Sequence, residues 1–155
     1  MAVHPSASLD VASQLGDLLA RVQAAIRRSL AGAGISLAQA RALSSVDRHE
    51  SLRLTDLAML EQVAQPTISA MAARLESAGL LRRRGSPDDG RAVIVELTDA
   101  GRASVDSIRR LRSRMLADHL GALPAEELAA LEAALPAFTT LVDRLESRTS
   151  VGHPV

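Results

Sequence analysis

Arginines gather in one short stretch of the chain, and their chemistry is recognition rather than catalysis. Residues 82–84 are three consecutive arginines, and Arg91 follows a polar loop that contains Pro87 and Gly90. A guanidinium group is planar, always charged and able to donate paired hydrogen bonds to phosphate or guanine. Four arginines stand against two aspartates between residues 82 and 91, a local charge of +2 in a chain of zero net charge. This distribution favours contact with a nucleic-acid backbone, although the absence of lysine fits codon usage equally well.

A second set of polar candidates lies just before the arginines, on a helix predicted from Gln65 to about Ala78. Its apolar side has helical spacing and consists of Ile68, Met71, Ala72 and Leu75. The side facing away carries Gln65, Thr67, Ser69 and Arg74. Glutamine can pair with adenine through two hydrogen bonds, whereas threonine and serine suit phosphate contacts; ordinary helix capping is the alternative role of Gln65. Such a small polar face can enter a major groove about 12 Å wide.

Two kinds of element must position these side chains. A short helix from Thr55 to Glu61 should precede the candidate helix, with Thr55 as its cap and Leu57, Ala58 and Leu60 buried. Pro66 fits the first turn of the candidate helix, and Gly79 ends it. Strand-like pieces flank the loop 86–91, because Val93, Val95 and Leu97 alternate with Ile94 and Glu96. The pattern predicts a helix-turn-helix followed by a β wing.

Longer helices should flank this unit on both sides. Leu15 to Leu30 carries an apolar stripe, Ser36 and Gln39 form a capping box for the next helix, and residues 48–54 could add a brief strand. Thr98 should cap a long helix that ends near Leu120. A sixth helix begins near Pro124, and Pro136 should kink or break it. These outer helices either pack within one chain or form a dimer interface, and we favour the dimer because two-fold proteins match palindromic DNA.

Composition narrows the remaining possibilities. Phe138 is the only aromatic residue, so the core must be aliphatic, and no cysteine is present for disulfide or thiol chemistry. No apolar run reaches the length of a membrane span, and the start of the chain lacks a signal pattern, so we expect a cytoplasmic protein. The four histidines have no metal-site spacing, and no catalytic motif occurs. We therefore expect no metal, no cofactor and no enzymatic activity.

The ordered motifs together resemble the MarR family of winged helix-turn-helix transcriptional regulators. The matching segments are 54–58 (LTDLA), 66–69 (PTIS), 74–83 (RLESAGLLRR), 88–91 (DDGR) and 95–101 (VELTDAG), within a likeness that covers about residues 15–145. Each segment is weak evidence alone, whereas their order is specific. The resemblance implies a homodimer that binds double-stranded DNA at an inverted-repeat operator, usually as a repressor, and that small phenolic or other aromatic ligands often release.

The resemblance also assigns roles within the wing. The family's Asp-x-Arg element corresponds to Asp89, Gly90 and Arg91, with the arginine expected in the minor groove and the aspartate holding it in place. The full set of candidate DNA-binding residues is Gln65, Thr67, Ser69, Arg74, Arg84, Ser86, Asp89 and Arg91. Arg82 to Arg84 should alternate in direction along a strand, so that at most two face DNA and the others are solvated or pair with acids. A ligand pocket should lie among the first and second helices and the start of the fifth.

The expected fold class is mainly α with a small β hairpin, a winged helix-turn-helix with N- and C-terminal dimerisation helices. We expect a disordered lead-in over 1–8, one domain over 9–147 and a disordered tail over 148–155. The winged helix should span about 36–97, and the dimerisation helices about 9–31 and 98–147. The expected function is sequence-specific DNA binding. The alternative is an interaction protein that has lost operator binding, since the candidate recognition helix carries little positive charge.

Overall fold

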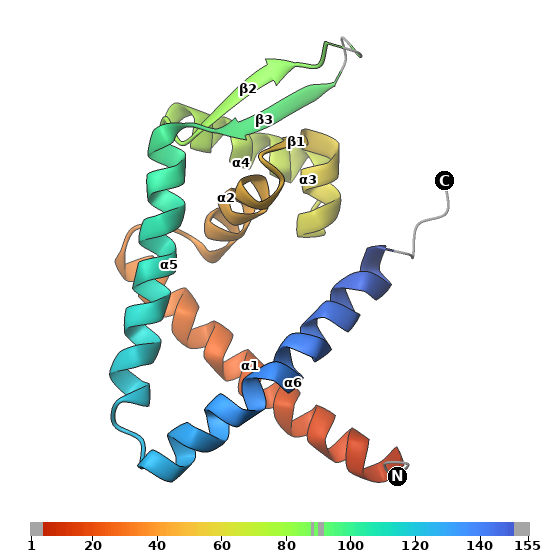
Figure 1. Cartoon of the computed structure of the whole chain (residues 1–155). Helices are drawn as coiled ribbons and strands as arrows, with labels where there is room; N and C mark the ends of the chain where they lie inside the picture. Colours follow the sequence, from red (N-terminus) through yellow and green to blue (C-terminus); the bar gives the residue numbers. More distant parts are fainter. Residues whose placement is uncertain (1–4, 88, 90–91, 151–155) are drawn as a thin grey trace. The chain divides into compact units, whose positions relative to one another are not determined.

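The computed structural model describes residues 5–150 of the chain, except residues 88, 90 and 91. Over these residues the structure is mainly helical, with one small sheet (Figure 1). The elements are α1 (Pro5–Gly32), α2 (Leu37–His49), β1 (Ser51–Arg53), α3 (Leu54–Glu61), α4 (Gln65–Ser77), β2 (Leu81–Gly85), β3 (Val93–Leu97), α5 (Asp99–Leu120) and α6 (Ala125–Ser150). This arrangement confirms the predicted fold class.

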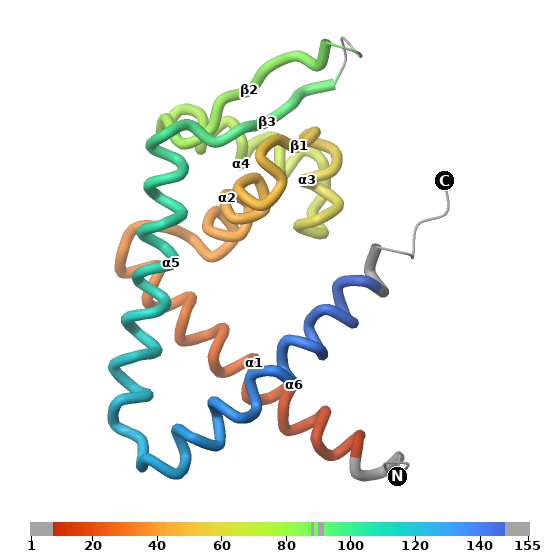
Figure 2. Tube along the Cα trace, viewed as in Figure 1, coloured from red at the N-terminus to blue at the C-terminus, as the bar shows by residue number. Residues whose placement is uncertain are grey.

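The chain divides into two compact units, residues 1–114 and 115–155, with the boundary inside α5. The first unit holds α1 to α4, the sheet and most of α5, and its path can be followed by colour from red to green in Figure 2. The second unit holds the end of α5 and all of α6. All candidate DNA-binding residues belong to the first unit.

The sheet has the strand order β1-β3-β2, and both pairings are antiparallel. The predicted hairpin is β2 with β3, and the brief strand expected within 48–54 is β1. Leu81 pairs with Leu97 and Arg83 with Val95, so these four side chains share one face of the sheet. Because Leu81, Val95 and Leu97 are buried, this is the face that covers the core.

The core of the first unit is aliphatic, as the composition requires. Fully buried side chains come from α1, α2, α3, α4, α5 and the sheet. They include Leu30, Leu43, Val46, Leu57, Ile68, Leu75, Leu81, Val95, Leu97 and Val105. Ile68 and Leu75 anchor α4, so its opposite side is left for solvent or a ligand. The predicted apolar stripe of this helix is therefore confirmed.

Two of the predicted caps are present. The Gln39 backbone N–H donates to Ser36 Oγ at 3.1 Å, and the Ser36 N–H donates to Gln39 Oε1 at 3.0 Å, which completes the capping box. The Gly101 N–H donates to Thr98 Oγ1 at 3.0 Å at the start of α5. The cap predicted at Thr55 is wrong, because α3 begins one residue earlier and Arg53 occupies the N-cap position without a side-chain hydrogen bond.

The buried side of α3 also differs from the prediction at one position. Leu57 and Ala58 are buried as predicted, but Leu60 is 45% exposed. Residues three and four apart share a helix face, so Leu54, Ala58 and Glu61 lie together on the inner side, and Leu60 is turned about 100° away from Glu61. Glu61 can occupy the inner side because Ser45 and Arg41 of α2 contact its carboxylate there.

The outer helices extend further than expected. Helix α1 begins at Pro5, inside the range 1–8 that was predicted as a lead-in, and α6 continues to Ser150. Helix α6 continues through Pro136 as one helix, so the predicted local break is absent, while the kink that was its alternative stays a prediction. Among the described residues, no helix combines the length and the apolar character that a bilayer span needs.

Candidate nucleic-acid interface

Helix α4 presents the start of its polar side to solvent. Ala64 is its N-cap residue, and no side-chain hydrogen bond closes this end of the helix. Gln65 and Thr67 are exposed, whereas Ser69 is half-buried. The backbone N–H groups of a helix N-terminus attract anions, so this end of α4 suits a phosphate or a base edge.

The turn before α4 is held by backbone geometry. Gln62 ends α3 in a left-handed conformation, with φ 54° and ψ 44°. The Val63 N–H then donates to the Ala58 carbonyl oxygen at 3.1 Å. The half-buried Val63 packs against the core, so the turn fixes the start of α4 relative to α3.

Arg74 lies further along the exposed side of α4. Its Nε donates to the carbonyl oxygen of Ala70, one turn earlier on the same helix, at 3.3 Å. The side chain is exposed and retains further N–H donors on its guanidinium group. The geometry therefore leaves Arg74 able to reach a neighbouring phosphate.

The wing loop is described only in part. Ser86 is buried, and its backbone N–H donates to the Ala92 carbonyl oxygen at 2.9 Å, which extends the hairpin by one step. Asp89 is exposed, and its carbonyl oxygen accepts the Ala92 N–H at 2.9 Å. Asp88, Gly90 and Arg91 lie outside the described residues, so the role assigned to Arg91 stays a prediction.

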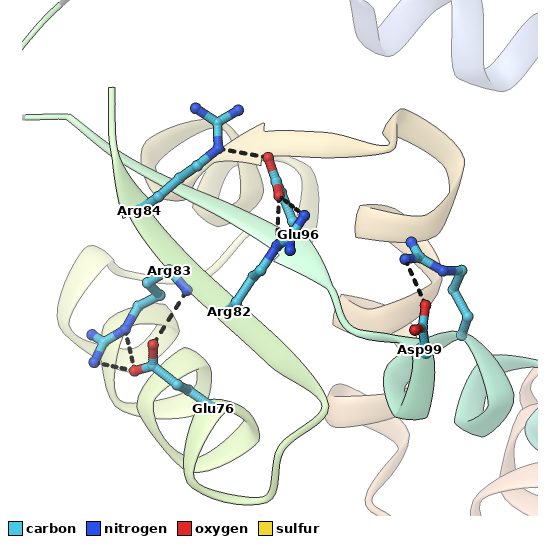
Figure 3. Close-up of polar contacts among 7 residues, drawn as sticks. Glu76, Arg82, Arg83, Arg84, Glu96 and Asp99 are labelled. Carbon is cyan, nitrogen blue, oxygen red and sulfur yellow. Dashed lines mark hydrogen bonds and ion pairs between the residues drawn. The ribbon is translucent and has the colours of Figure 1, made fainter. Parts of the chain in front are cut away.

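Arg83 connects strand β2 to helix α4. Its Nε donates to Glu76 Oε2 at 2.6 Å, and its backbone N–H donates to Glu76 Oε1 at 3.2 Å (Figure 3). Through these hydrogen bonds Arg83 holds the pKa of the Glu76 carboxyl below its ordinary value of 4.5. Glu76 is therefore charged at neutral pH and ties β2 to the C-terminal half of α4.

The other two arginines of β2 share one acid on the opposite face of the sheet. Arg82 Nε donates to Glu96 Oε2 at 2.8 Å, and Arg84 Nε donates to Glu96 Oε1 at 2.6 Å (Figure 3). The hydrogen bonds from Arg84 and Arg82 lower the pKa of Glu96 from 4.5. The predicted alternation of these arginines is confirmed, and each of the three has an acidic partner.

The backbone just after α4 and the backbone at the start of α5 lie close together. The Thr98 hydroxyl donates to the Gly79 carbonyl oxygen at 2.6 Å, and the Thr98 N–H donates to the Leu80 carbonyl oxygen at 3.1 Å. A side-chain carbon on Gly101 would come within 2.0 Å of that Leu80 oxygen. Only glycine permits this approach, which sets where α4, β2 and α5 meet.

A buried acid lies between α2 and α3. Ser45 Oγ donates to Glu61 Oε1 at 2.6 Å, and Arg41 Nε lies 3.0 Å from Glu61 Oε2. The Glu61 side chain is only 8% exposed. A carboxylate this deeply buried requires such partners, and they fix the position of α3 against α2.

A cavity of about 340 Å³ opens beside this acid. Its apolar wall includes Ile26, Leu30, Leu37 and Ile108, from α1, α2 and α5. Its polar wall includes four arginines, namely Arg41, Arg48, Arg109 and Arg112. The size matches small-molecule sites, which occupy about 300–1,000 Å³. The cavity is lined by α1 and α2 as predicted for a ligand pocket, but by the middle of α5 and by the end of α3 where the start of α5 was expected. Over the described residues, no three His, Asp or Glu side chains converge as a metal site would require.

Comparison with known proteins decides the family. Residues 35–93, which run from before α2 into β3, match the model of the MarR family. An HTH-type transcriptional regulator of Mycobacterium tuberculosis is 30% identical over 133 residues, which cover 86% of this chain and 93% of that protein. The chain belongs to the MarR family. The HTH-type transcriptional repressor MdtR of Bacillus subtilis is also 30% identical, over 77% of each chain.

Solved structures agree with this placement in the MarR family. A MarR family protein from Bacillus stearothermophilus has a TM-score of 0.74 at 21% identity and covers 92% of this chain and 99% of that one, which shows the shared fold. A mutant MarR from E. coli, crystallised in complex with operator DNA, has a TM-score of 0.59 at 28% identity. The structural match covers 81% of this chain and 93% of the E. coli chain.

Several residues that organise the interface escaped sequence reasoning. Glu76 and Glu96 were not singled out as partners of the wing arginines, and Gly101 was not recognised as a close-packing position. A signal for Glu96 existed, because a correct strand register places it directly opposite Arg82. A signal for Gly101 existed too, since glycine is unfavourable inside a helix unless packing demands it.

Proposed function

We propose that this MarR family chain is a sequence-specific DNA-binding transcriptional regulator that acts as a homodimer on an inverted-repeat operator. The observation that carries the proposal is the exposed polar side of α4, whose C-terminal half is joined to the arginine-bearing strand β2 by the Glu76–Arg83 pair. In this arrangement α4 reads base edges through Gln65, with Thr67 and Ser69 near phosphates. Arg74, Arg84, Ser86 and Asp89 complete the described part of the interface, and Arg91 inserts into the minor groove.

Exposed apolar surface supports the homodimer. Helix α6 carries large apolar side chains at spacings of three and four, all between 39% and 61% exposed: Leu131, Leu135, Phe138, Val142 and Leu145. Helix α1 carries Leu18, Leu19 and Val22, each more than 40% exposed. An apolar stripe of this kind on each helix favours burial against a second copy, and a two-fold dimer matches a palindromic site. The outer helices, about 9–31 and 98–147, are thus the proposed dimerisation elements.

Repression released by a small ligand is the proposed mode of regulation. The repressor MdtR among the relatives supports the direction of the effect. The cavity supports release, because its arginines and aliphatic wall suit a small aromatic anion. A ligand there would contact α1, α2 and α5 together and could favour one spacing of the two DNA-binding halves over another.

A second function is favoured by one specific observation. Arg74 and Glu76 are the only charged side chains of α4, so the recognition helix itself has no net charge. Such a helix also suits a winged-helix protein that has lost operator binding and acts through protein partners. Failure to select any duplex from random or genomic DNA, together with recovery of a specific protein partner, would favour this second function.

The deciding experiment selects genomic DNA fragments with the full chain and measures affinity for the selected fragment by mobility shift. Sedimentation at twice the mass of one copy is expected, as is affinity that falls steeply with salt. Arg91→Ala should weaken binding to the selected fragment by about tenfold or more while leaving the fold intact.

Arg110→Ala, which removes the same charge from an exposed site on α5, is the matched control and should bind like the wild type. Equal affinities for all three proteins would contradict the role of Arg91, and sedimentation as a single copy would contradict the dimer.

A further inference from the structure

The outer face of the sheet, which points away from the core, is a basic surface with one acid in it. In the strand register, Arg82 of β2 lies opposite Glu96 of β3, and Arg84 of β2 lies opposite Ile94 of β3. On the other side of β3, Arg53 of β1 lies opposite the same Ile94. Directly paired residues share a face, so three arginines and one glutamate lie on this side. This face therefore has more arginines than acids. Glu96 lies on β3, the central strand, between β1 and β2.

Glu96 occupies both of its carboxylate oxygens with arginines. Oε1 accepts from Arg84, and Oε2 accepts from Arg82, at 2.6 and 2.8 Å (Figure 3). The Glu96 side chain is 14% exposed, whereas Arg82 is 67% and Arg84 47% exposed. The acid is thus fixed in the sheet, while both arginine side chains remain partly exposed to solvent. An approaching phosphate must displace this carboxylate or share the arginines with it.

We propose that Glu96 competes with DNA phosphate for Arg82 and Arg84, and so limits the affinity of the protein for DNA of any sequence. The inference rests on the proposed DNA-binding function and deepens it. Affinity without sequence preference comes from phosphates neutralised by basic side chains. Contacts of α4 with base edges are untouched by Glu96. Because phosphate contacts are the same on operator and on random DNA, Glu96 should set the overall affinity and its salt dependence without contacting a base.

The competition has a measurable signature in the salt dependence of binding. The logarithm of the binding constant falls with the logarithm of salt concentration by about 0.9 for each phosphate neutralised on duplex DNA. If Arg82 and Arg84 are released from Glu96 and contact phosphate instead, this slope should steepen by about 1 to 2. At about 0.1 M salt, each new phosphate contact should raise affinity roughly eightfold.

The test compares the full-length wild type with Glu96→Gln on a fluorescent duplex of random sequence, by anisotropy over a series of salt concentrations. Glutamine keeps the size of the side chain and removes its charge. Glu132→Gln, at an exposed position on α6 outside its apolar stripe, makes the same change of net charge away from the sheet, and sedimentation checks that this variant keeps the mass of the wild type. We expect tighter binding and a steeper slope for Glu96→Gln, and wild-type behaviour for Glu132→Gln.

A further variant ties the effect to the two arginines. Glu96→Gln combined with Arg82→Gln and Arg84→Gln should lose the gain in affinity and return the slope to the wild-type value or below. Circular dichroism and thermal melting establish that each variant is folded before its slope is compared.

Three outcomes would overturn the inference. A folded Glu96→Gln protein with unchanged affinity and slope would show that the carboxylate does not compete with phosphate. Weaker binding would show that Glu96 holds the arginines in place for DNA instead. If the wild type and Glu132→Gln bind neither random nor selected duplexes at any salt concentration, the proposed function fails, and the inference falls with it.

Discussion

The packing of α5 against the segment that follows α4 depends on the absence of a side chain at Gly101. A Cβ atom at this position would lie 2.0 Å from the Leu80 carbonyl oxygen and 3.1 Å from a methyl carbon of Leu97. The oxygen cannot move away freely, because it accepts the Thr98 N–H at 3.1 Å. Gly101→Ala should therefore push α5 away from the end of α4 or break this hydrogen bond.

The size of the effect follows from two opposing contributions. The Cβ–oxygen separation must grow from 2.0 Å to at least 3.0 Å, and overpacking of a core typically costs about 1–3 kcal/mol. Replacing glycine by alanine inside a helix returns about 0.5–1 kcal/mol through higher helix propensity. Because the obstacle is backbone, the cost should lie in the upper part of its range, so we expect a net loss of about 2 kcal/mol. For a chain of this length that corresponds to a melting temperature lower by about 4–8 °C.

Thermal melting by circular dichroism, at one fixed protein concentration, measures this difference. Gly16→Ala is the matched control, since Gly16 lies inside α1 and a Cβ there would have nothing within 4 Å. The same chemical change should raise stability by about 0.5–1 kcal/mol at that site. A melting temperature for Gly101→Ala equal to or above that of the wild type would refute the close approach of α5 to Leu80.

Two further predictions concern the acids of the first unit. Glu76 and Glu96 have pKa values lowered below 4.5, so their contribution to stability is complete above that pH and is lost as the pH falls through their folded-state values. Urea midpoints should therefore decrease from pH 7 to pH 3, and the decrease should be smaller in Glu96→Gln; an equal decrease would argue against its ion pairs. Ser45→Ala removes the 2.6 Å hydrogen bond to the buried Glu61 carboxylate and should cost about 1.5–3 kcal/mol in urea unfolding. Ser44→Ala, at the half-buried neighbouring position, should change stability by less than about 0.5 kcal/mol, and equal losses in the two variants would contradict the role of Ser45.

Sequence reasoning succeeded where the signal is local. The capping box of Ser36 and Gln39 and the cap at Thr98 involve residues three apart, so their chemistry is visible in a short window. The alternation that predicts β3 is equally local. Thr55 has the chemistry of a cap as well, but α3 begins at Leu54 because that side chain is buried in the core. Tertiary burial, which no short window contains, decided that boundary.

The inner side of α3 shows why the remaining features were not predictable. Hydrophobicity alone places Leu60 inside and Glu61 outside, whereas the structure does the reverse. Glu61 can be buried because Ser45, sixteen residues earlier in the chain, donates to it from α2, and Arg41 on the same helix pairs with its other oxygen. Whether a buried carboxylate has a hydrogen-bond partner depends on such distant residues. The free-energy difference between a paired and an unpaired buried carboxylate exceeds the gain from burying one leucine side chain.

The same dependence on distant partners governs the candidate interface. Three arginines in sequence suggest a charge of +3 for binding DNA, but the fold brings Glu76 and Glu96 to within hydrogen-bonding distance of them. Arg83 becomes a structural link between β2 and α4, while Arg82 and Arg84 stay partly exposed on the other face. The charge available to a phosphate is thus set by strand register, since a shift of β2 by one residue would exchange the two faces. Under the proposed function, DNA binding by this protein should therefore depend as much on where its acids lie as on where its arginines lie.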